Sequence, residues 1–152
     1  MHLTLAFLGW TKDERLPAVV EAAGAAAAGQ RSFDLSFAGA GRFPAAGRAR
    51  VVWLGVGDGR TALEEIAARV TDQLRARELR FDERPFAPHL TLARVTPDAS
   101  AAEARAVGAA VDGLATPELR ASVDRIAVVQ SVLSRQGPRY TELAAAPLAA
   151  GG

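Results

Sequence analysis

The chain of 152 residues contains no cysteine, only two histidines and a single lysine. Without cysteine it has no disulfide, no thiolate nucleophile and no Cys-ligated zinc, a composition that fits a reducing cytosol. Its 18 Lys and Arg against 17 Asp and Glu give a net charge of +1, which excludes a wholly basic protein that coats nucleic acid but permits a local cationic cleft. Any catalysis must therefore use histidine, carboxylates, hydroxyl groups or arginine.

A long apolar run is also missing. Residues 1–10 are apolar, but no basic segment precedes them and Lys12 and Asp13 follow at once, so they resemble neither a signal peptide nor a membrane span. The Ala-rich residues 22–28 are too few to cross a bilayer and include Gly24. We expect a cytoplasmic protein with no membrane partner.

The size of the chain suits one domain, or two small lobes that share a core, because domains commonly have roughly 100–150 residues. With 49% hydrophobic and 23% charged residues, the composition is that of a globular protein able to bury a core. We expect a single domain over residues 1–152.

The pattern of polar and apolar residues predicts an α+β order of elements. Strands are predicted at residues 2–8, 32–37, 51–56, 89–92, 123–132 and 140–143, and helices at residues 13–28, 60–79 and 99–111. The nearly continuous apolar run at 51–56 predicts a strand buried on both faces. A loop at 39–47, a helix start at Pro97, a turn near Gln136 and a frayed tail from residue 144 complete the order. The elements divide near residue 80, so we expect lobes of roughly residues 1–80 and 81–146.

Both histidines lie in the same tetrapeptide, His-Leu-Thr-Leu, which begins at His2 and again at His89. A given histidine is followed by Leu-Thr-Leu by chance about once in two thousand tries at this composition, so the repetition indicates an internal repeat. On a strand, residues two apart share a face. Each motif therefore presents an imidazole and a hydroxyl together, His2 with Thr4 and His89 with Thr91, while its leucines point the other way.

Two imidazoles that face one cleft suit general acid–base chemistry, in which a neutral ring accepts a proton and a protonated ring supplies one. The threonine hydroxyls can donate hydrogen bonds to anionic oxygens, so a phosphodiester fits this layout. The alternative is two strands whose outward-facing His and Thr have no role. We expect no metal, because zinc takes three or four protein ligands and the chain offers two histidines with no carboxylate at ligand spacing.

Several segments resemble the 2H phosphoesterase superfamily, and within it the bacterial and archaeal RNA 2′,3′-cyclic phosphodiesterases, also called 2′-5′ RNA ligases. The resemblance covers nearly the whole chain, and the paired motif is specific at this separation in one small domain. The segments are the two His-Leu-Thr-Leu motifs, Phe7-Leu8-Gly9, Val52-Trp53-Leu54-Gly55-Val56, Phe86-Ala87-Pro88 before the second motif, Ala93-Arg94 after it, and the late Ser131, Leu133, Gly137 and Tyr140.

The resemblance implies a two-lobed, pseudo-twofold α+β fold whose antiparallel sheets flank a central cleft, with one His-x-Thr motif on the central strand of each lobe. It implies metal-independent and cofactor-free opening of an RNA 2′,3′-cyclic phosphate to a 2′-phosphate, together with 2′-5′ RNA ligase activity. One histidine protonates the departing 3′-oxygen, the other activates water, and Thr4 and Thr91 hold phosphate oxygens. We assign His2 as the acid and His89 as the base, although two identical motifs do not fix that order.

Arg94 follows the second motif as it does in the resembled family, which makes it a candidate for bidentate contact with phosphate or RNA. It lies five residues after His89, so strand alternation places it on the opposite face unless a bulge, a strand end or a long reach intervenes. A structural ion pair is the equal alternative. Tyr140, Phe43 and Trp10 can stack on a base or instead pack in the core or at its rim. Cationic side chains expected in loops, as RNA contacts or as solvated arginines, are Arg42, Arg48, Arg135 and Arg139.

The resembled proteins usually carry an initial strand and helix before the first motif, whereas here the motif begins at residue 2. A missing strand leaves a sheet edge open beside the first motif. The expected partner is an RNA end with a cyclic phosphate or a small nucleotide, bound by a monomer. The alternatives are a noncatalytic module that binds RNA ends, an inactive truncated fragment, and a 2H phosphodiesterase acting on a small nucleotide.

Overall fold

The computed structural model describes residues 2–96, 98–114, 119–134 and 137–151. The chain forms two compact units, each assembled from separate stretches of sequence. Unit 1 contains Met1–Leu3, Asp34–Arg60 and Ala87–Ala121, and unit 2 contains Thr4–Phe33, Thr61–Phe86 and Ser122–Gly152. These units differ from the expected lobes at residues 1–80 and 81–146, because each unit combines segments from both halves of the sequence.

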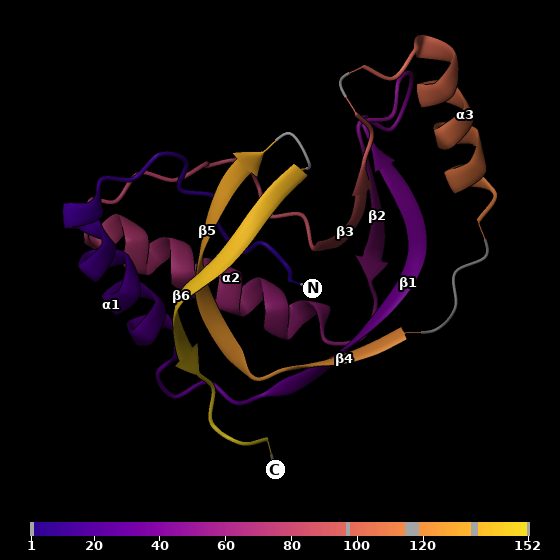
Figure 1. Cartoon of the computed structure of the whole chain (residues 1–152). Coiled ribbons are helices and arrows are strands. Elements are labelled where there is room, and N and C mark those ends of the chain that lie inside the picture. Colours follow the sequence, from indigo (N-terminus) through magenta and orange to yellow (C-terminus); the bar gives the residue numbers. More distant parts are fainter. Residues whose placement is uncertain (1, 97, 115–118, 135–136, 152) are drawn as a thin grey trace. The chain divides into compact units, whose positions relative to one another are not determined.

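Unit 1 is built on a four-stranded sheet in the order β3-β2-β1-β4 (Figure 1). The strands are β1 Phe33–Phe43, β2 Val51–Val56, β3 His89–Arg94 and β4 Leu119–Val123. Strand β2 pairs antiparallel with both β1 and β3. The second His-Leu-Thr-Leu motif therefore begins an edge strand of this sheet.

One face of the unit 1 sheet is buried and the other is only partly covered. Along β2 burial alternates residue by residue, with Val52, Leu54 and Val56 buried and the residues between them half-buried. The expectation that residues 51–56 are buried on both faces is therefore wrong. The half-buried positions include Trp53 and Gly55, which carry the candidate site described below.

Helix α3 (Ala101–Asp112) covers the buried face of this sheet. Its N-terminus is fixed by a capping box, in which Ser100 and Glu103 accept hydrogen bonds from each other's backbone N–H groups. On the buried face Arg42, paired with Val52, donates hydrogen bonds to both carboxylate oxygens of Asp112 at 3.2 and 3.0 Å. The ion pair ties the last turn of α3 to β1.

Unit 2 packs helices α1 (Leu16–Ala27) and α2 (Arg60–Ala76) against a two-stranded antiparallel sheet, β5 (Arg125–Ser134) with β6 (Gly137–Pro147) (Figure 1). A short 3-10 turn, Asp13–Arg15, precedes α1. Each helix contributes an apolar stripe to one core, since burying that stripe is the main stabilisation of a short helix in water. The largest members of this core are Val19, Ile66, Val70, Leu74, Leu79, Ile126 and Leu148.

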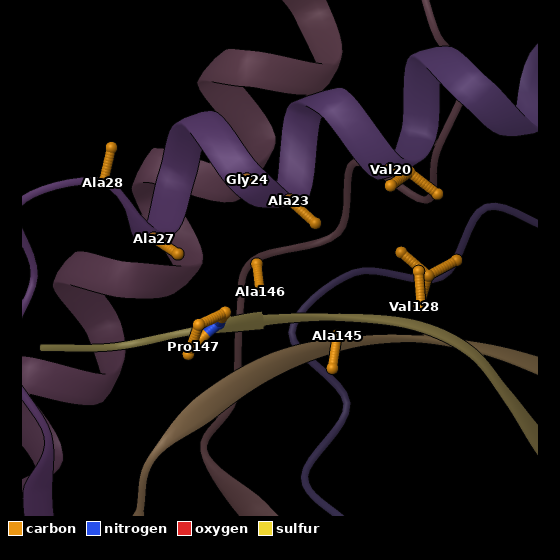
Figure 2. Close-up of a pocket in the computed structure, with 10 residues that line it drawn as sticks. Val20, Ala23, Gly24, Ala27, Ala28, Val128, Ala145, Ala146 and Pro147 are labelled. Atoms are coloured by element: carbon orange, nitrogen blue, oxygen red, sulfur yellow. The ribbon is translucent and has the colours of Figure 1, made fainter.

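A groove of about 290 Å³ lies in unit 2 between α1 and the two strands (Figure 2). Small side chains line it because α1 is rich in alanine and contains Gly24, and β6 contributes a run of three alanines before Pro147. Figure 2 shows Ala23 and Ala27 on the helix above Ala146 and Pro147 on the strand. The groove is apolar and contains none of the expected site residues.

Several expected boundaries are wrong. Residues 2–8 form no strand; within this segment the Phe7 carbonyl accepts a hydrogen bond from the Asp82 N–H at 2.8 Å. Residues 39–43 continue β1 instead of forming a loop, with Gly39 at a φ of 73° where the register against β2 shifts. The tail is not frayed from residue 144, because β6 runs to Pro147 and Leu148 is buried.

The remaining expected elements are found with shifted ends. The predicted strand at 123–132 is divided into β4 and β5, with Asp124 between them. The expected helix start at Pro97 and the turn at Gln136 lie outside the described residues. Among the described residues, no helix is both long and apolar enough to cross a membrane.

Candidate active site

His89 begins β3, and its ring is held by the chain immediately before it. The imidazole Nδ1 lies 2.6 Å from the carbonyl oxygen of Ala87. A carbonyl only accepts hydrogen bonds, so this contact places a proton on Nδ1 and leaves Nε2 as the nitrogen for proton exchange. The side chain is half-buried. His89 thus has a defined orientation and one free ring nitrogen, as a general acid or base requires.

Two aromatic rings lie against His89. The Phe43 ring centroid is 5.2 Å from that of His89, at an interplanar angle of 85°. The Trp53 centroid is 6.3 Å from it, at 64°. Phe43 and Trp53 also contact each other, with centroids 5.2 Å apart. The three rings form one cluster on the half-buried face of the unit 1 sheet.

Thr91 and Arg94 lie on this same face, which we call the His89 face. Thr91 is two residues after His89 and is paired with Trp53. The register between β2 and β3 then shifts, because Val52 pairs with Ala93 and Leu92 is the extra residue of a β-bulge. Arg94 consequently pairs with Val51, which shares a face with Trp53. The bulge therefore places Arg94 on the same face as His89, where the Arg94 side chain is exposed.

His2 belongs to unit 1, as His89 does, but it lies on no strand. Partial burial lowers the pKa of the His2 imidazole below its ordinary value of 6.5, and the positive charge of the amino terminus lowers that pKa further. Both effects favour the neutral ring. At neutral pH, His2 is therefore suited to accept a proton.

Thr4 and Tyr140 belong to unit 2. Thr4 lies outside the helices and strands, and Tyr140 is 48% exposed on β6, paired with Ser131. Their proximity to His89 stays a prediction. Trp10, the third aromatic candidate for stacking, is 85% exposed and also belongs to unit 2.

The arginines expected to attract RNA have different surroundings. Arg42 is largely buried and donates to Asp112 and to the Gly47 carbonyl, so it is a structural residue of unit 1. Arg48 donates to the Ala99 carbonyl at 2.9 Å. Arg139 lies on β6 and not in a loop, and Arg135 is outside the described residues. Among the described residues, no group of three or more His, Asp or Glu has a geometry that could hold a metal ion.

The contact of Trp53 and Phe43 with His89 is not predicted by the sequence. There Trp53 is expected in a buried strand that resembles the family, and Phe43 is expected to stack on a base or to pack in the core or at its rim. The contact depends on which strands pair and on their register, since Gly55 pairs with His89 and Phe43 pairs with Val51. The sequence carries a partial signal, because glycine in a strand often marks close approach of a neighbouring group, and Gly41 and Gly55 flank this site.

Comparisons with known proteins agree with these features. A model of the 2′-5′ RNA ligase superfamily matches residues 1–135. An RNA 2′,3′-cyclic phosphodiesterase of Geobacillus stearothermophilus is 33% identical over 147 residues, which make up 97% of this chain and 45% of that protein. One of Aeropyrum pernix is 32% identical over 143 residues, 93% of this chain and 78% of that protein. This chain therefore spans less than half of the first relative and about three quarters of the second.

Solved structures have the same fold. The structure of TT0787 from Thermus thermophilus matches with a TM-score of 0.70 and 30% identity, over 99% of this chain and 79% of that one. Escherichia coli LigT complexed with 3′-AMP matches with a TM-score of 0.70 and 30% identity, over 97% and 76%. The expectation of an α+β fold with antiparallel strands is confirmed. The chain belongs to the 2′-5′ RNA ligase superfamily, within the 2H phosphoesterases that its paired motifs resemble.

Proposed function

We propose that this chain hydrolyses RNA 2′,3′-cyclic phosphate ends to 2′-phosphates by a metal-independent, two-histidine mechanism. The observation that carries the proposal is the His89 face, where an oriented imidazole, the Thr91 hydroxyl and the Arg94 guanidinium share one side of a sheet. Relatives named RNA 2′,3′-cyclic phosphodiesterases that match over nearly the whole chain support the same substrate.

In the proposed reaction a water oxygen attacks phosphorus while a neutral imidazole accepts the proton of that water. The bond between phosphorus and the ribose O3′ breaks, and an imidazolium donates its proton to the departing O3′. The product is a 2′-phosphomonoester with a free 3′-hydroxyl. Thr91 donates a hydrogen bond and Arg94 two charge-assisted hydrogen bonds to the nonbridging oxygens, whose negative charge grows in the transition state.

The pKa of His2 bears on which histidine does which step. A lowered pKa keeps the ring neutral near pH 7, which favours His2 as the base that activates water. His89 is then the acid that protonates O3′ through Nε2. This allocation reverses the one expected from the sequence, where the two identical motifs offered no basis for choosing.

Thr4 and Tyr140 complete the proposal as contacts of the phosphate and of the terminal nucleotide. With a 5′-hydroxyl in place of water as the nucleophile, the same displacement of O3′ joins that hydroxyl to the cyclic phosphate and gives a 2′-5′ linkage, the ligase activity of the family name. A substrate of nucleotide size is the second candidate, supported by the likeness to LigT, which is solved in complexes with 3′-AMP and with ATP. A monomeric state and a cytoplasmic location stay predictions from the sequence.

Incubation of the chain with a 2′,3′-cyclic-phosphate oligoribonucleotide in EDTA tests the proposal. We expect the 2′-phosphate product at an undiminished rate in EDTA, and a loss of at least about 100-fold in His2→Ala and in His89→Ala, the scale of one general acid or base. A matched oligonucleotide with a 3′-phosphate should remain unchanged.

Three outcomes separate the alternatives. Unchanged turnover in either histidine variant contradicts the two-histidine mechanism. Tight binding of the cyclic-phosphate end without turnover identifies a noncatalytic binding module. Turnover of a cyclic mononucleotide but not of the oligonucleotide identifies a phosphodiesterase for small nucleotides.

A further inference from the structure

The indole of Trp53 occupies space that a side chain at Gly41 would fill. Gly41 on β1 pairs with Trp53 on β2. A Cβ atom added at Gly41 would lie 2.2 Å from both Cη2 and Cζ2 of the indole, far inside van der Waals contact. The ring therefore lies across the β1 backbone, and only glycine at position 41 permits that placement.

The neighbouring glycine of β2 serves the same arrangement. Gly55 lies two residues after Trp53 and pairs with His89, so all three occupy the His89 face. A Cβ atom at Gly55 would lie 3.8 Å from Cζ3 of the indole and 2.8 Å from the Ala38 carbonyl oxygen. Gly41 thus leaves room for the indole over β1, and Gly55 leaves the position paired with His89 without a side chain.

Trp53 gives up a hydrogen bond in this position. Its Nε1–H is buried and has no acceptor among the described residues. A buried donor without a partner costs stability, and buried tryptophans usually find one. Phenylalanine would fill much of the site without that cost. Stability alone therefore does not account for an indole here.

The indole does contact the candidate catalytic group. The Phe43 and Trp53 rings both lie next to His89 while the Ala87 carbonyl holds Nδ1, so the imidazole has few orientations left. Positioning of a catalytic group matters steeply, because a displacement of about 1 Å can cost on the order of 100-fold in rate. Trp53 and Phe43 lie on the strands β2 and β1, and a group held by strands is positioned more precisely than one held by loops.

We propose that Trp53, seated over Gly41, is a positioning residue that fixes the imidazole plane of His89 for proton transfer. This inference rests on the proposed function for its catalytic consequence, whereas its structural consequence is measured without any substrate. The two can therefore fail separately.

The first test is proton NMR of the imidazole signals, which come from only two histidines, with His2→Gln used to assign them. Ring currents from Phe43 and Trp53 should displace the His89 ring protons from the positions of a solvated histidine. We expect Trp53→Phe and Gly41→Ala to move the His89 signals while those of His2 stay in place. Unmoved His89 signals in both variants overturn the proposal, whether or not the chain is an enzyme.

The second test compares kcat, KM and thermal unfolding on the cyclic-phosphate oligonucleotide. We expect Trp53→Phe to lower kcat on the order of tenfold, with KM within twofold and Tm within about 3 °C, because an unpaired donor is removed with part of the ring. The control is Val20→Ala, which shortens an exposed apolar side chain of unit 2 that has no role in the proposed site. If the lower Tm reduces the folded fraction at the assay temperature enough to explain the whole fall in kcat, the role of Trp53 is merely structural and the proposal is overturned.

A pair of variants separates positioning from general damage. Gly41→Ala alone should lower kcat more than Trp53→Phe, because the new methyl group displaces the indole. In the double variant the indole atoms that collide with that methyl are gone, so kcat should return to the value of Trp53→Phe alone. Strictly multiplicative losses in the double variant contradict the proposed contact. Gly24→Ala, whose added Cβ meets nothing within 4 Å, is the control for a Gly-to-Ala change.

Discussion

At the scale of single residues, the site depends on one register shift. Arg94 would face away from His89 on a regular strand, and the extra residue Leu92 returns it to the His89 face. The sequence predicted that regular alternation would place Arg94 on the opposite face from His89, and that a bulge could bring it back. It did not contain the location of the bulge, because pairing with β2 decides which residue is left out of the ladder.

Arg94→Gln tests the role of that guanidinium. We expect KM for the cyclic-phosphate oligonucleotide to rise about tenfold. A charge-assisted hydrogen bond contributes about 1.5–3 kcal/mol, and in the variant water replaces part of that interaction with the phosphate. Steady-state kinetics give the value. Arg105→Gln, on the helix that covers the opposite face, should leave KM unchanged. Equal effects of the two substitutions would show that only net charge matters.

Thr91→Val tests the neighbouring hydroxyl with little change in shape. Loss of one donor to the developing negative charge should lower kcat by about 10- to 100-fold, at the low end of what one oxyanion donor supplies. The single-turnover rate is the appropriate measurement, because product release does not limit it. An unaltered single-turnover rate would remove Thr91 from the site.

At the scale of elements, long periodic segments were predictable and the chain around the first motif was not. The apolar stripes of α1 and α2 and the existence of the strand β1 follow from local sequence, although Ser36 is buried between Leu35 and Phe37 and so departs from the expected alternation. Residues 2–8 show partial alternation of polar and apolar residues, but a strand forms only where a partner strand pairs with it. The strand pairs β1–β2, β2–β3 and β5–β6 do not include these residues. Alternation predicts which side chains share a face, and it does not predict a partner strand.

Helix α1 carries a glycine in its interior that costs stability. The Cβ of alanine at position 24 would meet nothing within 4 Å, because it enters the groove of Figure 2. Gly24→Ala should therefore raise the free energy of unfolding by about 0.5–1 kcal/mol, by reducing the freedom of the unfolded chain. Urea denaturation measures it. A decrease would mean that the groove closes on that position.

Helix α3 depends on its first turn. Ser100→Ala removes the acceptor for the Glu103 N–H and should lower the free energy of unfolding by about 1 kcal/mol. Urea denaturation followed by circular dichroism gives the change. Ser100→Asp keeps an acceptor at this position and serves as the control, so a matching loss in both variants would show that the cap contributes nothing.

At the scale of the whole molecule, the sequence predicted the family and the α+β class but not the division of the chain. A split near residue 80 follows from the repeated order of elements, whereas each compact unit combines segments from both halves. Sheet pairing causes the difference, since β3 from the second half pairs with β2 from the first. Long-range pairing of this kind leaves no local signal in one sequence.

The pH dependence of kcat/KM tests the central claim, two-histidine catalysis, most directly. The base must be neutral, so activity falls as pH decreases through its pKa, and the lowered pKa of His2 places that acidic limb below pH 6.5. We predict that in EDTA this acidic limb disappears from the residual activity of His2→Ala, which lacks the base, but persists in that of His89→Ala, which keeps it. A profile in which His2→Ala keeps the acidic limb would contradict the account.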